Sequence, residues 1–430
     1  MWAALGGDPE LTRRISYSGP RGLLTARLPV MELARATVAV CALAAAERAA
    51  CGAAGPVPAV RVDDGAVATA FVSERHLLLD GRAPVNFAPM SRFWRTADGW
   101  VRTHANYPHH RAALLTALDT DEDGVERALA GRRALEVEET VHAAGGLAVA
   151  LRTPEQWAAH PQGAAAARQR LVARERLDDT APRRRSHRLR VLDLTRVIAG
   201  PVATRTLALL GADVLRVDPP GLPELPDQHA DTGFGKRSAT LDLDSPADRR
   251  TFDELLDRAD VLVTGYRPGA LDGYGLTRPG LVVAQVSAWG DDGPWGDRRG
   301  FDSLVQVASG IAVVEGSPDR PGTLPAQALD HGTGYLLAAA VLRSLTEQER
   351  DGGTRLVRLA LARTAHFLTH GLSSVAGGEA ESYDAGRLLA EADSPLGRLR
   401  YALPPVSYDG GPTTWSRPPG VWGADAPTWL

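Results

Sequence analysis

Short apolar runs of strand length alternate with amphipathic stretches of helical period in the second half of the chain. The run at residues 191–194 is followed by a turn around Gly200, an amphipathic stretch to Leu210 and a second run at 214–217, which is the pattern of a βαβ unit. The pattern recurs in SPADRRTFDELLDR, which opens with a capping-box spacing, and in the strand-like runs DVLVTGY and LVVAQVS. Buried strands that alternate with helices predict a Rossmann-like, doubly wound parallel sheet, so the predicted fold class is α/β.

The first segment has a different pattern. An alanine-rich helix is predicted over residues 33–49, short strands near Val60 and Trp100, and helices rich in alanine and arginine as far as Arg176. This mixture predicts a smaller α+β domain. An apolar helix precedes AVRVDD in the first segment, and another, at residues 335–345, precedes RLVRLAL in the second. The echo suggests that the chain contains two versions of one unit.

These patterns divide the chain into four parts. Residues 1–180 form the predicted small α+β domain, and residues 191–377 form the Rossmann-like domain. Between them, APRRRSHRLR at residues 181–190 is a basic, proline-containing stretch, interpreted as a solvated linker with phosphate binding as the alternative. Residues 378–430 are poor in apolar periodicity and rich in glycine, proline and aspartate, which predicts an irregular tail packed on the surface.

The composition of the chain limits where the protein is expected in the cell and which partners it is expected to bind. The 430 residues carry a net charge of -4 with 23% charged residues, so no strong field favours nucleic acid or acidic substrates. The start of the chain does not resemble a secretory signal, and the most apolar stretch, residues 36–46, is about half the length of a membrane span. Two cysteines are too few for a disulfide framework. A cytoplasmic protein without a nucleic-acid or membrane partner is predicted.

Five motifs follow one another from Val191 to Leu342. In order they are VLDLTRVIAGPVATRTLALLGADVLRV, GKRSATLDL, VTGYRPGALDGYG, SAWGDDGPWGDRRGFDSLVQVASG and QALDHGTGYLLAAAVL. This ordered series closely resembles the family III CoA-transferases, the CaiB/BaiF family. In the first segment, TADGWVRTHANYPHHRAALLTAL and LRTPEQWAAHPQG are similar to the small domain that comes later in this family. Relative to the family, the two halves of this chain therefore stand in swapped order.

The resemblance implies transfer of coenzyme A between an acyl-CoA thioester and a free carboxylic acid, with Asp330 as the nucleophile. Such a carboxylate is acylated to a mixed anhydride and then converted to an aspartyl-CoA thioester, which splits one difficult exchange into easier steps. Asp330 lies just before an apolar helix, so a helix cap is the structural alternative. Asp302 matches the position that the family places beside its nucleophile, and its alternative is again an N-cap.

Coenzyme A carries a pyrophosphate and an adenosine 3'-phosphate, so its site requires cations and exposed amides. By resemblance, its contacts fall on Ile198, Ala199, Gly235, Lys236, Gly265, Tyr266, Arg267, Arg299 and Phe301. Lys236, the only lysine of the chain, and Arg267 are the leading candidates among them. A solvated surface lysine is the alternative for Lys236.

Three further features bear on the ligands. Ile198 stands where formyl-CoA transferases have a glutamine, and no counterpart of their glycine-rich lid is found, so a formyl or oxalyl substrate is not expected. His104, His109 and His110 have no carboxylate or cysteine at ligand spacing, so no metal is predicted. Coenzyme A is expected as a substrate, and the resemblance implies a homodimer. The active site is expected at the junction of the two domains.

Other functions remain open beside CoA transfer. An α-methylacyl-CoA racemase requires a histidine and aspartate pair, and Phe301 occupies the histidine's place before Asp302. A dinucleotide-binding dehydrogenase would use Asp218 at the end of the second strand, but VIAGPV has one glycine where the fingerprint needs three. A non-catalytic CoA-binding relative is the third alternative. The sequence does not identify the acyl donor or the acceptor.

Overall fold

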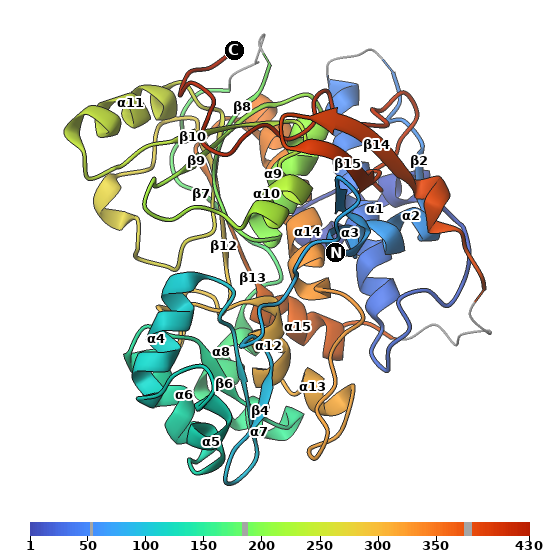
Figure 1. Ribbon diagram of the computed structural model, residues 1–430. Helices are drawn as coiled ribbons and strands as arrows, with labels where there is room; N and C mark the ends of the chain where they lie inside the picture. Colours follow the sequence, from blue (N-terminus) through green and yellow to red (C-terminus); the bar gives the residue numbers. More distant parts are fainter. Residues whose placement is uncertain (52–54, 183–187, 374–380) are drawn as a thin grey trace.

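The computed structural model describes residues 1–51, 55–182, 188–373 and 381–430. Its centre is a seven-stranded sheet with the order β10, β9, β8, β11, β12, β13, β7 (Figure 1). All strands but β7 run parallel; they are β8 (Arg190–Leu194), β9 (Asp213–Asp218), β10 (Lys236–Thr240), β11 (Val261–Thr264), β12 (Val282–Ser287) and β13 (Arg355–Ala360). The predicted Rossmann-like α/β fold is confirmed. The strand order reverses at β8, so the carboxyl ends of β8 and β11 flank a switch point, where such sheets bind ligands.

Helices cover both faces of this sheet. On one face, α9 and α14 share a hydrophobic core with Val191 and Val263, and on the other, α11 packs on Leu192 and Leu262. Successive side chains of a strand point to opposite faces, so strands covered on both sides are apolar throughout. The helices of this domain are α9 (Ala199–Leu209), α10 (Pro226–Thr232), α11 (Pro246–Asp257), α14 (Ala328–Asp351) and α15 (Leu361–His370).

The first segment does not form the single domain predicted for residues 1–180. A separate hydrophobic core, between Met90 and Ala150, belongs to an antiparallel sheet and its helices, drawn in cyan and teal in Figure 1. They are β4 (Phe93–Arg95), β5 (Trp100–Thr103), β6 (Ala148–Ala150), α4 (Pro108–Leu118), α5 (Val125–Ala130) and α6 (Ala134–Ala143). The residues before this small domain pack into the core of the large domain, and β7 (Ala173–Arg176) pairs antiparallel with β13. The first segment therefore contributes to both domains.

Four short helices lie near the junction of the two domains. They are α7 (Pro154–Ala159), α8 (Pro161–Arg168), α12 (Asp302–Ala308) and α13 (Ile311–Val314). Of these, α12 contacts β5 and β6 of the small domain and also α14 and α15 of the large one. It therefore links the two domains directly.

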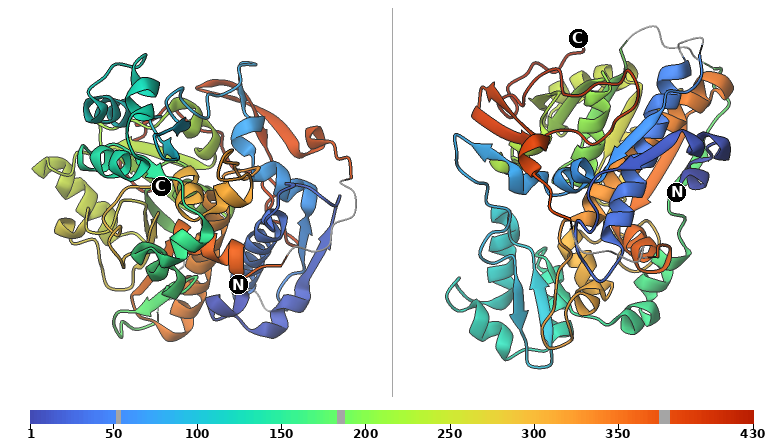
Figure 2. Two further views of the ribbon diagram at one scale, coloured as in Figure 1. Left: turned by 90° about the horizontal axis from the view of Figure 1, so that it is seen from below. Right: turned by 90° about the vertical axis from the view of Figure 1, so that its right-hand side faces the viewer.

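The two stretches that echo each other in sequence have the same local structure. α1 (Val30–Cys51) is followed by β2 (Val60–Asp63) and directly by α2 (Asp64–Ala70), just as α14 is followed by β13 and directly by α15. The two long helices lie side by side (Figures 1 and 2), with Leu33 of α1 next to Gly332 of α14. The helix from the first segment thus completes the core around the helix that carries Asp330. Two short elements flank this unit, β1 (Ile15–Ser18), parallel to β2, and α3 (Ser73–His76).

The C-terminal tail is more regular than predicted. β14 (Leu389–Ser394) and β15 (Gly397–Ala402) form an antiparallel hairpin that pairs with β3 (Leu78–Leu79). The remainder is irregular and runs along the edge strand β10, where Ala424 forms a bridge with Ala239. Three indole N–H groups of this stretch donate to the large domain: Trp415 to the Arg205 carbonyl, Trp422 to Asp218 and Trp429 to the Leu255 carbonyl. The tail thereby covers an edge that would otherwise be open to another strand.

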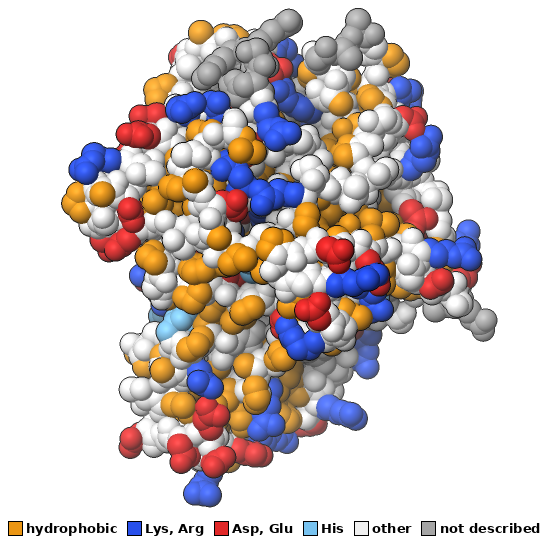
Figure 3. Space-filling view, turned by 45° about the horizontal axis from the view of Figure 1, so that its top comes forward, with side chains coloured by type: hydrophobic (Ala, Val, Ile, Leu, Met, Phe, Trp, Pro, Cys, Tyr) orange, Lys and Arg blue, Asp and Glu red, His pale blue; other side chains and the backbone are white. Residues whose placement is uncertain are grey.

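The outer surface mixes charges of both signs. On the face shown in Figure 3, hydrophobic side chains gather between the upper and lower parts of the molecule. Of the predicted linker at residues 181–190, residues 183–187 lie outside the described residues. No helix in the described part of the chain combines the length and the apolarity needed to cross a bilayer.

Candidate active site

Asp330 lies in the first turn of α14, and its side chain, 5% exposed, lines two adjacent cavities. Asp302, the first residue of α12, accepts the backbone N–H of Asp330 at 2.9 Å and a second hydrogen bond from the Gln306 side chain. Asp302 therefore caps α14. None of the described residues donates a hydrogen bond to the Asp330 carboxyl group, which leaves that group free for chemistry.

The two carboxyl groups influence each other's ionisation. Burial, the charge of Asp302 and that of Glu74 raise the pKa of Asp330 well above its ordinary value. Burial also raises the pKa of Asp302 to about 6, against the opposing effect of its hydrogen bonds from Asp330 and Gln306. Carboxylates that share a buried site do not both ionise readily. The pair therefore retains a proton at a pH where isolated carboxyl groups have lost theirs.

The two cavities differ in the residues that form them. The first-segment cavity, of about 370 Å³, is lined largely by residues of the first segment, among them Glu74, Phe87 and His104. The switch-point cavity, of about 290 Å³, lies at the carboxyl ends of the strands beside β8. Four residues line both cavities: Tyr107, Val197, Phe301 and Asp330. Asp330 thus stands where the two cavities meet.

Most of the predicted coenzyme A contacts lie in the switch-point cavity; they are Ala199, Gly265, Tyr266, Arg267, Arg299 and Phe301. Ile198 lines the first-segment cavity instead. Neither Arg267 nor Arg299 forms an ion pair with a carboxylate in the described part of the chain, and burial together with the charge of Arg267 lowers the pKa of Arg299. The N-terminus of α9 also faces this cavity through Ala199 and Gly200. Guanidinium groups and helix N-termini both suit phosphate groups.

Gly235 and Lys236 lie apart from both cavities. The Lys236 ammonium group is buried and donates to the Asp193 carboxylate and to the Pro201 carbonyl, each at 3.0 Å. Burial lowers the pKa of Lys236 to about 8. Gly235 has φ 76°, and a Cβ there would lie 2.8 Å from the Ala208 side chain. Both residues therefore stabilise the core of the large domain. The Lys236 ammonium group does not face either cavity, where it was predicted to contact a phosphate group.

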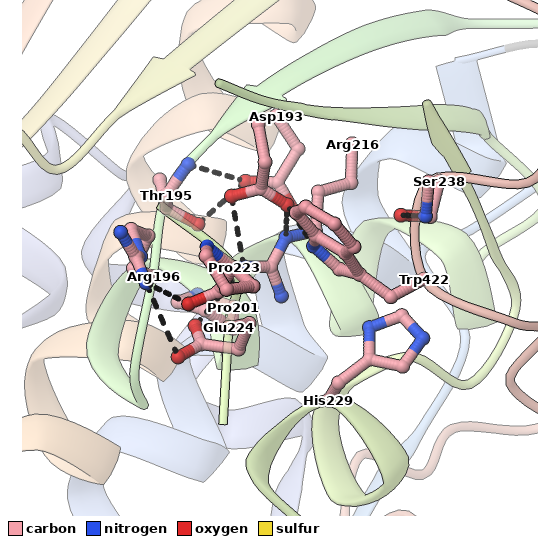
Figure 4. Close-up of polar contacts among 12 residues, drawn as sticks. Asp193, Thr195, Arg196, Pro201, Arg216, Pro223, Glu224, His229, Ser238 and Trp422 are labelled. Atoms are coloured by element: carbon pink, nitrogen blue, oxygen red, sulfur yellow. Dashed lines mark hydrogen bonds and ion pairs between the residues drawn. The ribbon is translucent and has the colours of Figure 1, made fainter. Parts of the chain in front are cut away.

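Sequence reasoning assigned no role to Tyr107, Val197 or Glu224, which are linked at the wall between the cavities (Figure 4 shows Glu224 and its surroundings). Glu224 accepts hydrogen bonds from the Tyr107 hydroxyl, from the Val197 N–H at 3.0 Å and from Arg216 at 3.0 Å. Burial alone would raise the pKa of Glu224, but Arg216 and its other partners lower it, so Glu224 is ionised. One buried carboxylate thus ties the small domain to the loop after β8.

Val197 has φ 69°, in the left-handed region. A β-branched side chain is strained in that conformation. No pattern in the sequence signals this backbone, because the region is usually marked by glycine.

The three histidines of the small domain lie near the wall between the cavities. The His104 ring stacks on Phe301 with centroids 3.7 Å apart, and His109 and His110 are 4.0 Å apart. Burial lowers the pKa of both His104 and His110 to about 3, so both rings are uncharged at neutral pH. In the described part of the chain, no group of three or more candidate metal ligands is found.

Known proteins resemble the part of the chain that contains the site. Residues 187–387 match the model of CoA-transferase family III. The chain is 34% identical to a "probable fatty acyl-CoA transferase" of Mycobacterium tuberculosis over 193 residues, which are 40% of this chain and 49% of that protein. It is 34% identical to the succinyl-CoA–L-malate CoA-transferase beta subunit of Chloroflexus aurantiacus over 194 residues, 40% of this chain and 48% of that protein.

The chain spans about half the length of the curated relatives that it matches. Among solved structures, a CaiB/BaiF family protein from Brucella suis aligns with 49% of this chain and 64% of its own, at 26% identity and a TM-score of 0.37. The segment matched by the family model contains Asp302, Asp330, Arg267 and Arg299. Over residues 187–387, a little less than half of its length, this chain is therefore similar to CoA-transferase family III.

Proposed function

We propose that this protein transfers coenzyme A from an acyl-CoA thioester to a free carboxylic acid, with Asp330 as the nucleophile. The observation that carries the proposal is the place of the Asp330 carboxyl group, which has no hydrogen-bond donor among the described residues and stands where the two cavities meet. Coenzyme A would lie in the switch-point cavity beside Arg267 and Arg299, and the acyl group or the acid in the first-segment cavity.

The proposed chemistry exchanges groups at three carbonyl carbons: those of the acyl donor, of Asp330 and of the acceptor. An ionised Asp330 oxygen attacks the thioester carbonyl, the C–S bond breaks, and CoA thiolate leaves, giving a mixed anhydride. The thiolate then attacks the Asp330 carbonyl carbon, so the first acid departs as its carboxylate and an aspartyl-CoA thioester remains. The acceptor carboxylate attacks that thioester and releases the thiolate. Attack of the thiolate on the acceptor's carbonyl gives the new acyl-CoA and regenerates the Asp330 carboxylate.

The decisive test is the Asp330→Asn variant in an assay that follows label from a radioactive carboxylic acid into acyl-CoA. Asparagine keeps the shape of the side chain but has no attacking oxygen anion, so the exchange rate should fall by orders of magnitude. Hydroxylamine should trap a covalent species on the wild-type protein alone. Exchange at the wild-type rate by the Asn variant would refute the assignment of Asp330.

A racemase is the second candidate, and one contact favours it. Phe301 replaces the histidine expected beside Asp302, but His104 of the small domain stacks on Phe301 and lines the same cavity as Asp330. A racemase of this kind would use His104 to remove the α-proton of an acyl-CoA, although burial lowers its pKa to about 3 and so makes it a weak base, and a second group would return a proton to the opposite face. Incubation of a 2-methylacyl-CoA in D₂O separates the candidates. Deuterium at the α-carbon without exchange of the acyl group would support the racemase.

A further inference from the structure

The first-segment cavity has an apolar wall and an apolar mouth. Ile198, Leu225 and Phe301 line it, and Val85 and Phe87 stand at its surface with 68% and 38% of their areas exposed. Exposed hydrophobic side chains that rim a cavity mark a surface that takes up apolar ligands. The cavity therefore suits an acyl chain with few polar atoms.

The charged groups of this cavity are mostly acidic. Besides Asp330, the carboxylates of Glu74 and Asp227 line it. Arg82 holds the pKa of Asp227 below its ordinary value, and the pKa of Glu74 is also lowered, since the contact with His331 outweighs the effect of burial. Both carboxylates are therefore ionised at neutral pH.

The two arginines at this cavity each lie beside a carboxylate of the protein. Arg75 lines the cavity, and its Nε lies 3.7 Å from a Glu74 oxygen. Arg82, next to the cavity, is bound by both Asp227 oxygens. The guanidinium groups of Arg267 and Arg299, which have no carboxylate partner among the described residues, line the switch-point cavity instead. A second carboxylate on an acid bound in the first-segment cavity would face like charges, which disfavour a ligand strongly.

The unused hydrogen-bonding groups of the cavity are neutral. His104 Nδ1 and Gln228 Nε2 are buried atoms of lining residues that have no partner. Both side chains are uncharged, so they do not neutralise the charge of a carboxylate.

From this distribution of charge we propose that the acid exchanged in the first-segment cavity is a monocarboxylic acid with an apolar, uncharged chain, and not a dicarboxylic acid. This inference rests on the proposed transferase function. It names the substrate class of the same site.

Hexanoate and adipate form a matched pair for the test, because they have the same number of carbons and differ in one terminal carboxylate. With hexanoyl-CoA as donor, labelled adipate should enter the CoA pool with a kcat/KM about 100-fold below that of labelled hexanoate, the scale of a like-charge contact. Equal or better use of adipate would overturn the proposal.

A variant that releases a cation should shift the preference. Asp227→Asn frees Arg82 at the cavity, so the kcat/KM for adipate should rise about tenfold relative to that for hexanoate. Asp98→Asn is the matched control, because Asp98 likewise binds an arginine, Arg133, and a backbone N–H, but in the small domain away from the cavity. The control should leave the preference unchanged. An equal shift in both variants would contradict the role assigned to the cavity charges.

Direct binding separates this inference from the transferase proposal. In the Asp330→Asn variant the side chain is uncharged, as it is in an acylated enzyme, and calorimetry can compare the two acids without turnover. Tighter binding of hexanoate in the absence of any exchange by the wild-type protein would sustain the preference and defeat the transferase function. Equal binding of the two acids, or no binding of either, would overturn the preference itself.

Discussion

Asp330 must lose its proton before it can attack a thioester, and its surroundings oppose that loss. Burial contributes most to the raised pKa, followed by the charge of Asp302 and then that of Glu74. An ionised nucleophile is required, so kcat/KM should rise with pH, with a midpoint above the ordinary carboxyl range, because that profile reports groups of the free enzyme.

The Asp302→Asn variant tests this account of the nucleophile. It removes the neighbouring charge but keeps an oxygen that can accept the Asp330 N–H. The midpoint of the pH profile should therefore move to lower pH, and Glu74→Gln should move it in the same direction by less. The profile of kcat/KM against pH for the three proteins is the measurement. An unchanged midpoint in the Asp302 variant would show that the two carboxyl groups are not coupled.

Lys236 contributes to the stability of the large domain. Its ammonium group donates to Asp193 and to the Pro201 carbonyl, and Asp193 also accepts the Thr204 hydroxyl. Lys236→Met leaves the Asp193 carboxylate buried without its cation, which should cost about 3–5 kcal/mol of unfolding free energy. Denaturant unfolding gives that value. The folded variant should bind coenzyme A as the wild type does, whereas a selective loss of affinity with unchanged stability would restore Lys236 to the site.

The order of the motifs was enough to predict that Asp330, Asp302 and Arg267 lie in one region. Residues at the ends of neighbouring parallel strands meet at one edge of a sheet. The order of the motifs did not predict the direction of the Lys236 side chain. Whether a strand residue points to a ligand or to the core depends on its neighbours across the sheet, and Asp193 lies two strands away in the strand order. Glu74 and Tyr107 were missed because they reach the site only through the packing of the first segment.

At the scale of elements, the turn between β8 and α9 is a strained connection. Val197 occupies the left-handed region, and its N–H is held by Glu224. The buried carboxylate offsets the strain because it binds the N–H that the unusual backbone presents. The same carboxylate holds Tyr107, so the turn and the small domain are fixed together.

A double-mutant cycle tests this link between the turn and Glu224. Glu224→Gln should destabilise the protein and slow acyl exchange, while Val197→Gly should change the unfolding free energy by no more than about 1 kcal/mol, because relief of strain offsets the entropy cost of glycine. In the double variant, the Val197→Gly change should reduce the cost of Glu224→Gln. If the losses of unfolding free energy in the two single variants simply add in the double variant, Glu224 does not offset the strain at Val197.

β8, β9, β11 and β12 were predictable because both of their faces are buried and most of their side chains are therefore apolar. The parallel edge strand β10 reads KRSAT and carries no apolar run. β7, β14 and β15 were not predicted as strands of these sheets. β7 reads ARER and β14 reads LAEADS, so neither carries an apolar run, and each forms through pairing with a neighbour that local sequence does not reveal.

At the scale of the whole molecule, one chain supplies both walls of the site. Glu74 and Tyr107 come from the first segment, and Asp330, Arg267 and Arg299 come from the second. The distance between the two segments along the chain therefore does not separate them in space. The domain boundary at residue 180 could not be placed from sequence, because the helix α1 and the strand β7 belong to the large domain's core and sheet.

This arrangement leads to a prediction about dilution. The family resemblance predicts a homodimer, but a site assembled within one chain should keep its specific activity when a dimer dissociates. Light scattering gives the mass to compare with 45.7 kDa for one chain, and the exchange assay gives the activity at the same concentrations. Activity that falls in step with the mass would show that a second copy completes the site.

The pairing of α1 with α14 also means that α1 must wait for its partner helix during synthesis. α14 begins at residue 328, so a ribosome that has finished α1 needs roughly 14–55 s to reach it, at about 5–20 residues per second. Throughout that interval the apolar side chains of α1 lack the helix that buries them, and such exposed surface promotes aggregation. A nascent chain stalled before residue 328 should therefore be retained by chaperones, and the yield of folded protein should depend on how well α1 is shielded until α14 has been made.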